Sequence, residues 1–234
     1  MEAVPGPCQL TAGAYPDLMS LRWAIEHVHG DAGAFHAADP IARRSATFHT
    51  VPSPTLVLGS AQPDGEVDHR VAGALGVEVV RRRSGGGAVL LLPGEFAWLD
   101  LVIPAGDPLW LDDVGQAMVW VGDLWQRALM SLGVAGGVHH HGLVATTWSR
   151  QVCFAGVGTG EVMAGPSKLV GVSQRRTRTW ARFQSMCHLQ WRPEVAAALV
   201  AAPRPPATAL AQAAAVVPAE WAEVVEALTV LLHA

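Results

Sequence analysis

The sequence predicts one main domain of mixed α/β structure. Three observations support this class: 234 residues are enough to bury a substantial core, short β-rich apolar runs recur in the first half of the chain, and one long segment has the spacing of an amphipathic helix. No apolar run of about 18 residues and no basic start followed by an apolar segment occurs. We therefore expect a soluble cytoplasmic protein without a membrane span or a signal peptide.

The first predicted helix runs from Asp17 to Val28, where Leu18, Leu21 and Ile25 have helical spacing. Asp17 is placed as its N-cap and Gly30 as its stop, after an irregular arm over residues 1–16. The stretch from Pro40 to Pro54 is expected to be a connector.

Strands are predicted after this connector. Thr55 to Gly59 is a β-rich run that ends at glycine, Gly76 to Val80 has the composition of a buried strand, and Phe96 to Ile103 is the strongest strand signal. Asp68 to Leu75 is expected to form a short helix between the first two.

The best helix signal covers Asp112 to Leu132, with Gly133 as its C-terminal stop. Its Trp120 and Trp125 are expected in the core. Beyond Trp191, the sequence predicts a helix over Pro193 to Ala202, a break at three prolines, and a last helix from Pro218 to Leu232.

A glycine triplet, Gly85-Gly86-Gly87, follows Arg81-Arg82-Arg83-Ser84 and precedes Ala88-Val89. Glycines lack a Cβ atom, adopt positive φ readily and can bring successive N–H groups against an anion or a carbonyl oxygen. The position after a predicted strand and the preceding arginines favour a phosphate or acyl-adenylate cradle over a plain surface turn.

The basic residues are unusual in kind. Fifteen of the 16 are arginines, and Lys168 is the single lysine. An ammonium is a compact point charge that fits beside one carbonyl or phosphoryl oxygen, whereas arginine offers a planar fork. Lys168 is therefore predicted to have a specific role.

The net charge of −4 gives no reason to expect a nucleic-acid partner. Two arginine clusters stand out in this acidic chain, and they could form one patch for phosphate or for an acidic carrier domain. They consist of Arg81, Arg82 and Arg83, and of Arg175, Arg176, Arg178 and Arg182.

Three cysteines without Cys-x-x-Cys spacing argue against a disulfide framework and against a structural zinc site. Adjacent histidines such as His139-His140-His141 point to opposite faces of a strand, and no carboxylate or cysteine stands at a ligand-like offset, so no metal site is predicted.

The stretch Arg81-Arg82-x-Ser84-Gly85-Gly86-Gly87-Ala88-Val89 resembles the signature loop of the lipoate-protein ligases and their octanoyl-transferring relatives, in the superfamily that also includes biotin-protein ligases. Two further elements agree. Gly59-Ser60-Ala61-Gln62 resembles a Gly-x-x-Gln element after an early strand, and Lys168-Leu169-Val170-Gly171 resembles the hairpin that carries Lys-x-x-Gly.

The resemblance covers roughly residues 18–192 and implies an α/β fold with a largely antiparallel central sheet flanked by helices. It places a catalytic domain at residues 1–192. Residues 193–234 would be a short helical C-terminal extension, too short to be the accessory domain of full-length bacterial lipoate ligases.

The same resemblance implies an enzyme that attaches a lipoyl or octanoyl group to a lysine of a lipoyl carrier domain through an acyl-adenylate. ATP, Mg²⁺ and lipoate or octanoate would be required, and the partner would be the carrier domain of a 2-oxoacid dehydrogenase complex or a glycine cleavage protein. Lys168 would be catalytic, by stabilising charge on the attacked carbonyl. Substrate or adenylate would be bound by Arg81, Arg82, Ser84, Gly85, Gly86, Gly87, Ala88 and Gly171.

Two alternatives remain open. Cys153-Phe154 before Lys-x-x-Gly resembles the cysteine-dependent octanoyltransferases, in which Cys153 would take octanoate as a thioester from acyl carrier protein. The second alternative is a protein that binds the acyl group or acyl-adenylate without catalysis. Two departures from the family pattern leave it open: Leu90 to Leu92 replace the His-Asp that commonly follows the loop, and the family's later His-Gly is missing from Arg182 to His188.

Overall fold

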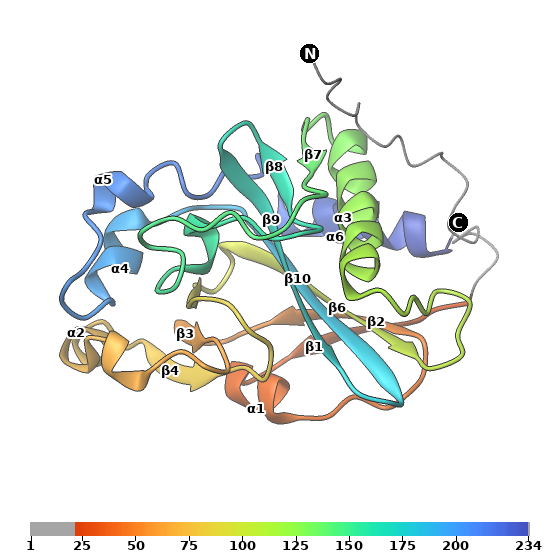
Figure 1. Ribbon diagram of the computed structural model, residues 1–234, viewed down its shortest axis with the longest axis horizontal. Coiled ribbons are helices and arrows are strands. Elements are labelled where there is room, and N and C mark those ends of the chain that lie inside the picture. Colours follow the sequence, from red (N-terminus) through yellow and green to blue (C-terminus); the bar gives the residue numbers. More distant parts are fainter. Residues whose placement is uncertain (1–21, 234) are drawn as a thin grey trace, which may run out of the picture.

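The computed structural model describes residues 22–233. Its larger sheet has the strand order β1-β2-β6-β10-β9-β8-β7, and every neighbouring pair is antiparallel except β1 and β2 (Figure 1). The strands are β1 (Ala24–His29), β2 (Ser45–Thr50), β6 (Phe96–Pro104), β7 (Gly137–Val138), β8 (Val162–Ala164), β9 (Ser167–Arg176) and β10 (Trp180–His188). The predicted α/β fold with a largely antiparallel sheet is confirmed.

A smaller sheet has the order β4-β3-β5, with β3 (Thr55–Leu58) parallel to β4 (Glu78–Arg81) and antiparallel to β5 (Val89–Leu91). The predicted strand at Thr55 is confirmed. The strand predicted to be buried at Gly76 is β4, in which Val79 and Val80 are half-buried and Glu78 and Arg81 are exposed, because it lies at the sheet edge and has one neighbour.

The helices are α1 (Ala32–Ala37), α2 (His69–Ala74), α3 (Val114–Ser131), α4 (Pro193–Ala198), α5 (Ala207–Leu210) and α6 (Trp221–His233), with 3₁₀ turns η2 (Asp64–Glu66) and η3 (Cys153–Ala155). Two helix predictions are confirmed in detail. The Asp68 carboxylate caps α2, and α3 ends before Gly133, whose φ is +76°. Trp120 and Trp125 of α3 are buried in the core.

The larger sheet is covered on both faces. Helices α3 and α6 pack on one face and form the main core with β6, β9 and β10 (Figure 1). The smaller sheet and α1 cover the other face, where Leu91 of β5, Trp98 of β6 and Met186 of β10 share a second cluster. The space between the two sheets is where the candidate site lies.

The first helix prediction is wrong over its described part. Ala24–His29 is strand β1, which pairs residue by residue with Ser45–Thr50. The apolar spacing at Ile25 and Val28 fits a helix equally well, and the parallel partner strand, which satisfies the backbone of β1, decides the outcome. The Asp17 cap and the arm over residues 1–16 lie outside the described residues.

The connector predicted from Pro40 to Pro54 is also wrong, because it contains β2. Ala46 and Phe48 of β2 are buried in the main core, and the strand is antiparallel to β6. A six-residue strand with histidine and threonine between its apolar residues gives a weak signal.

The segment after residue 192 packs into the same cores as the rest of the chain. Leu199 and Leu210 contact the cluster around β3, and Val224 and Leu228 of α6 belong to the main core. The backbone of Lys168 is bonded from this segment: its N–H donates to the Ala213 carbonyl at 3.0 Å and its carbonyl accepts from the Ala215 N–H at 2.9 Å.

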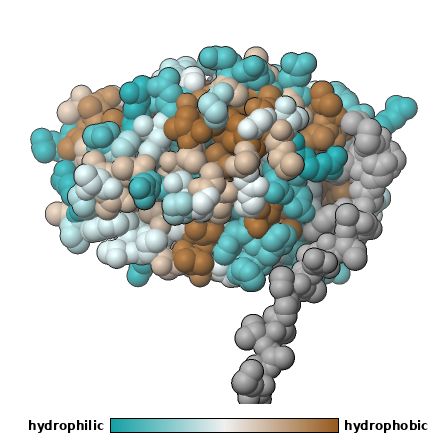
Figure 2. All heavy atoms as spheres, turned by 90° about the horizontal axis from the view of Figure 1, so that it is seen from above, coloured by the Kyte–Doolittle hydropathy of each residue, from teal (hydrophilic) through white to brown (hydrophobic). Residues whose placement is uncertain are grey.

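On the face seen in Figure 2, the hydrophobic surface residues form no single continuous patch and lie in separate groups between hydrophilic side chains. Within residues 22–233, none of the helices combines the length and the hydropathy that a membrane crossing needs.

Candidate active site

The glycine loop packs tightly beneath the end of β3. A Cβ atom at Gly59 would lie 1.8 Å from the Gly86 carbonyl oxygen, so no side chain fits at that position. Gly86 itself has φ +102°, a conformation that residues with a Cβ rarely adopt. The loop geometry therefore depends on glycine at both positions.

The backbone N–H groups of Gly85 and Gly86 are available to a ligand, whereas Gly87 is buried against the segment Ser149 to Cys153. Within the described part of the chain, those of Gly85, Gly86 and Gly87 donate to no other group, and Gly85 and Gly86 are exposed. Successive free N–H groups in such a loop form an anion-binding concavity. The geometry agrees with the predicted cradle, although binding by these residues stays a prediction.

Two arginines of the signature loop donate to backbone carbonyl groups, Arg82 within the loop and Arg81 in the Gly59–Gln62 element. The Arg82 guanidinium is buried and donates to the carbonyl oxygens of Gly85 at 2.7 Å and Gly87 at 2.9 Å. Arg81 donates to the carbonyls of Gly59, at 2.8 Å, and Gln62. Because the carbonyls are occupied in this way, the N–H side of the loop is left for a ligand.

The two arginine clusters meet at Asp39, to which Arg83 and Arg175 both donate, at 2.6 and 2.8 Å. Arg176 instead stacks on the Trp110 ring, and Arg182 is buried against Asp100. Arg182 is therefore not part of an exposed basic patch.

Lys168 lies at the start of β9, on the hairpin that the resemblance indicates, and its side chain is 1% exposed. Its Nζ forms an ion pair with Glu161 Oε2 at 2.7 Å and donates to the Cys153 carbonyl at 2.8 Å. The Phe154 ring centroid is 5.2 Å away. An ammonium has three N–H donors, so two are used and one remains.

Glu161 is a site residue that sequence reasoning missed. Its Oε2 also accepts from the Gly158 N–H at 2.6 Å, so the buried carboxylate is well satisfied. The residue stands in the quoted hairpin, seven positions before Lys168, and only the hairpin geometry brings the two together. In the sequence, the only indication of this pair is a carboxylate within the same hairpin as the single lysine.

A pocket lies between the smaller sheet and strands β6, β9 and β10, and its lining is mainly apolar, as is usual for small-molecule sites. Val57, Val89, Leu91, Trp98, Phe154, Val172 and Met186 form most of the wall, and His36, Ser173, Gln184 and Ser185 add polar groups.

Three predicted site residues line this pocket, namely Arg82, Cys153 and Gly171. The glycine loop reaches the same place, because a Cβ at Gly86 would be 3.6 Å from Cys153 Sγ. Lys168 is not in the lining, but its Nζ lies 5.2 Å from the centroid of the Phe154 ring, which does line the pocket. Ser84 is close by, with its hydroxyl 3.0 Å from that of Ser173.

The two described cysteines differ in reactivity. Cys187 is fully buried, and burial raises the pKa of its thiol to about 12. Cys153 is half-buried and faces the pocket. Since the thiolate is the nucleophilic form, Cys153 is the better candidate nucleophile of the two.

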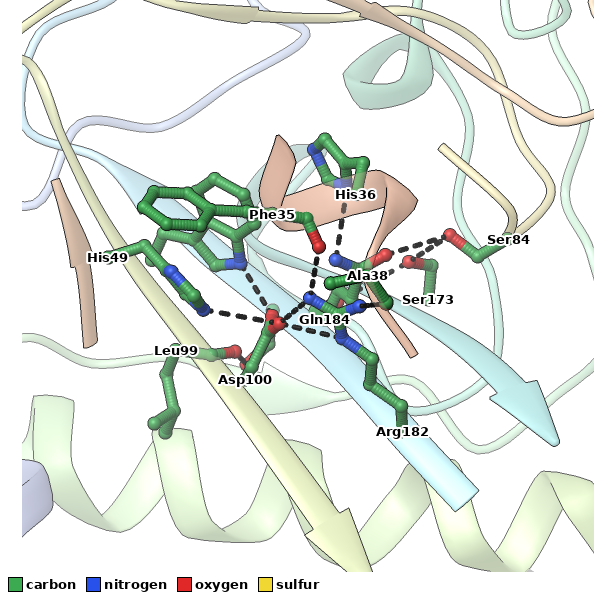
Figure 3. A network of polar contacts seen from close by, with 12 residues as sticks. Phe35, His36, Ala38, His49, Ser84, Leu99, Asp100, Ser173, Arg182 and Gln184 are labelled. Atoms are coloured by element: carbon green, nitrogen blue, oxygen red, sulfur yellow. Dashed lines mark hydrogen bonds and ion pairs between the residues drawn. The ribbon is translucent and has the colours of Figure 1, made fainter. Parts of the chain in front are cut away.

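A buried polar network holds α1 against the pocket (Figure 3). Asp100 pairs with Arg182 and accepts from the Trp98 indole at 2.6 Å. Burial alone would raise the pKa of the Asp100 carboxyl, but His49 and Arg182 outweigh it and hold this pKa well below its usual value. Arg182 also donates to the carbonyls of Phe35 at 2.9 Å and Ala38 at 3.1 Å, at the C-terminal end of α1.

Two buried histidines predict a loss of stability in mild acid. Burial lowers the pKa of His36 to about 4 and that of His188 to about 3. As the pH falls through about 6.5, the unfolded chain takes up these protons before the folded chain does, so the free energy of unfolding decreases, down to about pH 4 for His36 and about pH 3 for His188. At roughly 1.4 kcal/mol per unit of pKa difference, each histidine contributes roughly 3–5 kcal/mol over its range.

Urea denaturation at pH 7.5, 6 and 5 measures this slope. The His188→Phe variant should show a shallower slope than the wild type, whereas His69→Phe, at an exposed position, should not. Equal slopes in all three proteins would contradict the assignment.

The two sheets, the glycine loop and the lysine hairpin around one apolar pocket define a catalytic domain of the lipoate/biotin-protein ligase type. Residues 36–226 match the family model described as the lipoyl protein ligase A/B catalytic domain. The chain belongs to this family, and it is an enzyme of the ligase or transferase type.

Solved structures with the same fold include a T. acidophilum protein with bound lipoic acid, at 16% identity and a TM-score of 0.68, covering 90% of this chain and 83% of that one. A lipoate-protein ligase A bound with ATP, whose TM-score is also 0.68, is 18% identical over 91% of this chain and 85% of its own.

A third structure, a bi-partite lipoate protein ligase from Thermoplasma acidophilum described together with its E2 lipoyl domain, is 15% identical over 90% of this chain and 82% of that chain, with a TM-score of 0.68. A comparison with curated protein sequences gave no significant match.

The sequence predicts no metal site at His139-His140-His141, and residues 22–233 contain no group of three or more His, Cys, Asp or Glu side chains placed to hold a metal ion. His139 instead contacts the Gly142 carbonyl at 3.0 Å. The histidine run therefore belongs to a surface loop.

Proposed function

We propose that this enzyme activates lipoate or octanoate with ATP and transfers the acyl group from the acyl-adenylate to a lysine of a lipoyl carrier domain. The observation that carries the proposal is the buried Lys168–Glu161 pair, held beside an apolar pocket that the glycine loop reaches. Similar structures bind lipoic acid or ATP, or belong to a system with an E2 lipoyl domain, which supports the choice of substrates and partner.

Each part of the site has a role in this proposal. The apolar pocket holds the acyl chain, and the free N–H groups of Gly85 and Gly86 face the carbonyl and phosphate oxygens. The third N–H of Lys168 stabilises negative charge that develops as the carbonyl is attacked. Mg²⁺ would arrive with the ATP phosphates, as it usually does.

Glu161 acts as a positioning residue for Lys168. Its carboxylate is fixed by the Gly158 N–H and by the Lys168 ammonium, so the lysine cannot turn toward solvent. A preorganised charge costs no reorganisation when the reaction occurs. The carrier domain would be that of a 2-oxoacid dehydrogenase complex or a glycine cleavage protein.

Cys153 favours a second candidate function, that of an octanoyltransferase. Its Sγ lies beside Gly86 at the pocket, and Lys168 donates to the carbonyl of the same residue. In this reaction the Cys153 thiolate attacks the thioester carbonyl of octanoyl-acyl carrier protein, forms an enzyme thioester and releases the carrier thiol. The carrier-domain lysine then attacks the enzyme thioester.

Intact-mass analysis of a lipoyl carrier domain distinguishes the two reactions. The carrier is incubated with the enzyme and either free lipoate or octanoate plus Mg-ATP, or octanoyl-acyl carrier protein without ATP, and each reaction is repeated with Cys153→Ser. We expect acylation from the free acid with ATP, at an undiminished rate in Cys153→Ser.

Acylation only from the carrier thioester, lost in Cys153→Ser, would instead establish the transferase. No mass increase under either condition would refute both enzymes and leave a protein that binds the acyl group without transferring it. Cys187→Ser is not a suitable control because Cys187 is buried in the core, and Ser60→Ala, at an exposed position, serves instead.

A further inference from the structure

His36 lies on the last turn of the short helix α1 and enters the apolar pocket. The residue is 6% exposed, and its ring stacks on the Trp98 indole with 4.8 Å between centroids and 19° between planes. It is the one imidazole among the residues that line the pocket. A polar imidazole in a mainly apolar wall indicates a specific role for this residue.

The hydrogen bonds around His36 fix its tautomer (Figure 3). Gln184 Oε1 accepts from the Ser84 hydroxyl at 3.3 Å, which turns the Gln184 amide nitrogen toward His36 Nδ1 at 3.1 Å. Nδ1 therefore accepts, and the neutral imidazole carries its proton on Nε2. Burial lowers the pKa of His36 to about 4, so the ring is neutral at pH 7.

The Nε2–H of His36 has no hydrogen-bond partner among residues 22–233. The other ring nitrogen is occupied, so Nε2–H is the donor that a bound molecule could use. Its direction is rigidly set, because Arg182 holds the carbonyls of Phe35 and Ala38 on either side of His36.

The position of His36 along the pocket follows from the strand register. Gly171, which packs against Phe154, is paired with Met186, whereas Ser173 is paired with Gln184, the partner of His36. The two pairs are two residues apart, or roughly 7 Å. An acyl chain whose carbonyl lies near Cys153 and Gly86 would meet His36 several carbon atoms further along, at the end of the pocket where Ser84 contacts Ser173 and Gln184.

We infer that His36 is a specificity-determining residue, which selects acyl chains that carry a polarisable, hydrogen-bond-accepting group in their distal part, such as the dithiolane of lipoate, over a plain alkyl chain such as octanoate. This inference rests on the proposed function, in which the pocket holds the acyl chain. An alkyl chain buries the Nε2–H donor without an acceptor, which is unfavourable. A ring sulfur accepts weakly and also packs favourably on the Trp98 indole.

The test compares equilibrium binding of free lipoate and free octanoate by calorimetry at pH 7.5. The wild type should bind lipoate about tenfold more tightly, and this ratio should fall about threefold to tenfold in His36→Phe, which keeps a stacking ring and loses the donor. His36→Gln, which keeps an N–H donor, should retain most of the ratio. His69→Phe, an exposed histidine replaced in the same way, should bind as the wild type does.

An unchanged ratio in His36→Phe, or equal binding of the two acids by the wild type, would overturn the inference. If His36→Phe does not fold, Gln184→Met takes its place, since it frees Nδ1 and should also reduce the ratio. Binding of the free acids needs no transfer to a carrier. Failure of the proposed function would therefore appear as an absent mass increase on the carrier domain, whereas failure of the inference would appear in the binding ratio.

Discussion

Replacing Lys168 with methionine in a chain that also carries Glu161→Gln should lower the rate of acyl transfer about 10²–10³-fold while the chain stays folded. The ammonium is lost, and with it the charge that opposes the developing oxyanion. The double variant removes both members of the buried ion pair together, so no charge is left without a partner. Single-turnover transfer to the carrier domain measures the rate, and urea denaturation measures the free energy of unfolding.

The single variant Lys168→Ala is a poorer test. It leaves the Glu161 carboxylate buried without its cation, which costs roughly 3–5 kcal/mol, so lost activity could reflect lost structure. Arg22→Met, which removes a charge at an exposed position, is the matched control for the loss of a cation and should transfer at the wild-type rate. If the double variant transferred the acyl group at a rate within about threefold of the wild-type rate, instead of the expected 10²–10³-fold loss, Lys168 would have no part in the mechanism.

Gly86→Val should abolish the thermal stabilisation that lipoate plus ATP gives to the wild-type protein. The φ of Gly86 is +102°, which costs a β-branched residue roughly 1–3 kcal/mol in strain. The new Cβ would also lie 2.8 Å from Nη2 of Arg82 and 3.6 Å from Cys153 Sγ, at the place where the loop meets the pocket. Thermal unfolding with and without the ligands measures the effect.

Gly85→Ala is the matched control for this experiment. A Cβ at Gly85 meets no atom within 4 Å, and its φ is not in the positive region, so the ligand-induced shift should be retained. If Gly86→Val kept the full shift, the glycine loop would not be part of the binding site.

Local signals in the sequence indicated the loop and the hairpin correctly. The conformational freedom of glycine at positions 85–87 and the charge of lysine at position 168 are properties of the single residues, so they can be recognised without knowing the fold. The helices α2 and α3 were predictable for the same reason, because Asp68 and Gly133 mark their ends locally.

The missed features depend on residues far apart in the chain. Strand β1 is stabilised by pairing with β2, in which Ala24 lies opposite Ser45, and its own residues fit a helix as well as a strand. Asp100 is hidden in an apolar strand, and its partner Arg182 is 82 positions away. His36 becomes a pocket residue only because that pair fixes α1 beside Gln184.

The role of the signature arginines could not be read from their charge. The resemblance implies that Arg81 and Arg82 bind substrate, and Arg82 does line the pocket. Arg82 also donates to the Gly85 carbonyl of the loop, and Arg81 donates to the carbonyls of Gly59 and Gln62. Which of several acceptors an arginine fork uses is a matter of three-dimensional placement.

The strand that carries Lys168 donates a backbone hydrogen bond to the Ala213 carbonyl and accepts one from the Ala215 N–H, and the end of β10 accepts one from the Val217 N–H. A ribosome makes these residues after the rest of the site. A nascent chain that ends before Ala213 has the glycine loop, the hairpin and the pocket walls, yet the edge beside its lysine is unpaired. Because chains emerge from their N-terminus, residues 213–217 are made after the loop, the hairpin and the pocket walls, and the backbone around Lys168 is fully paired only once they have emerged.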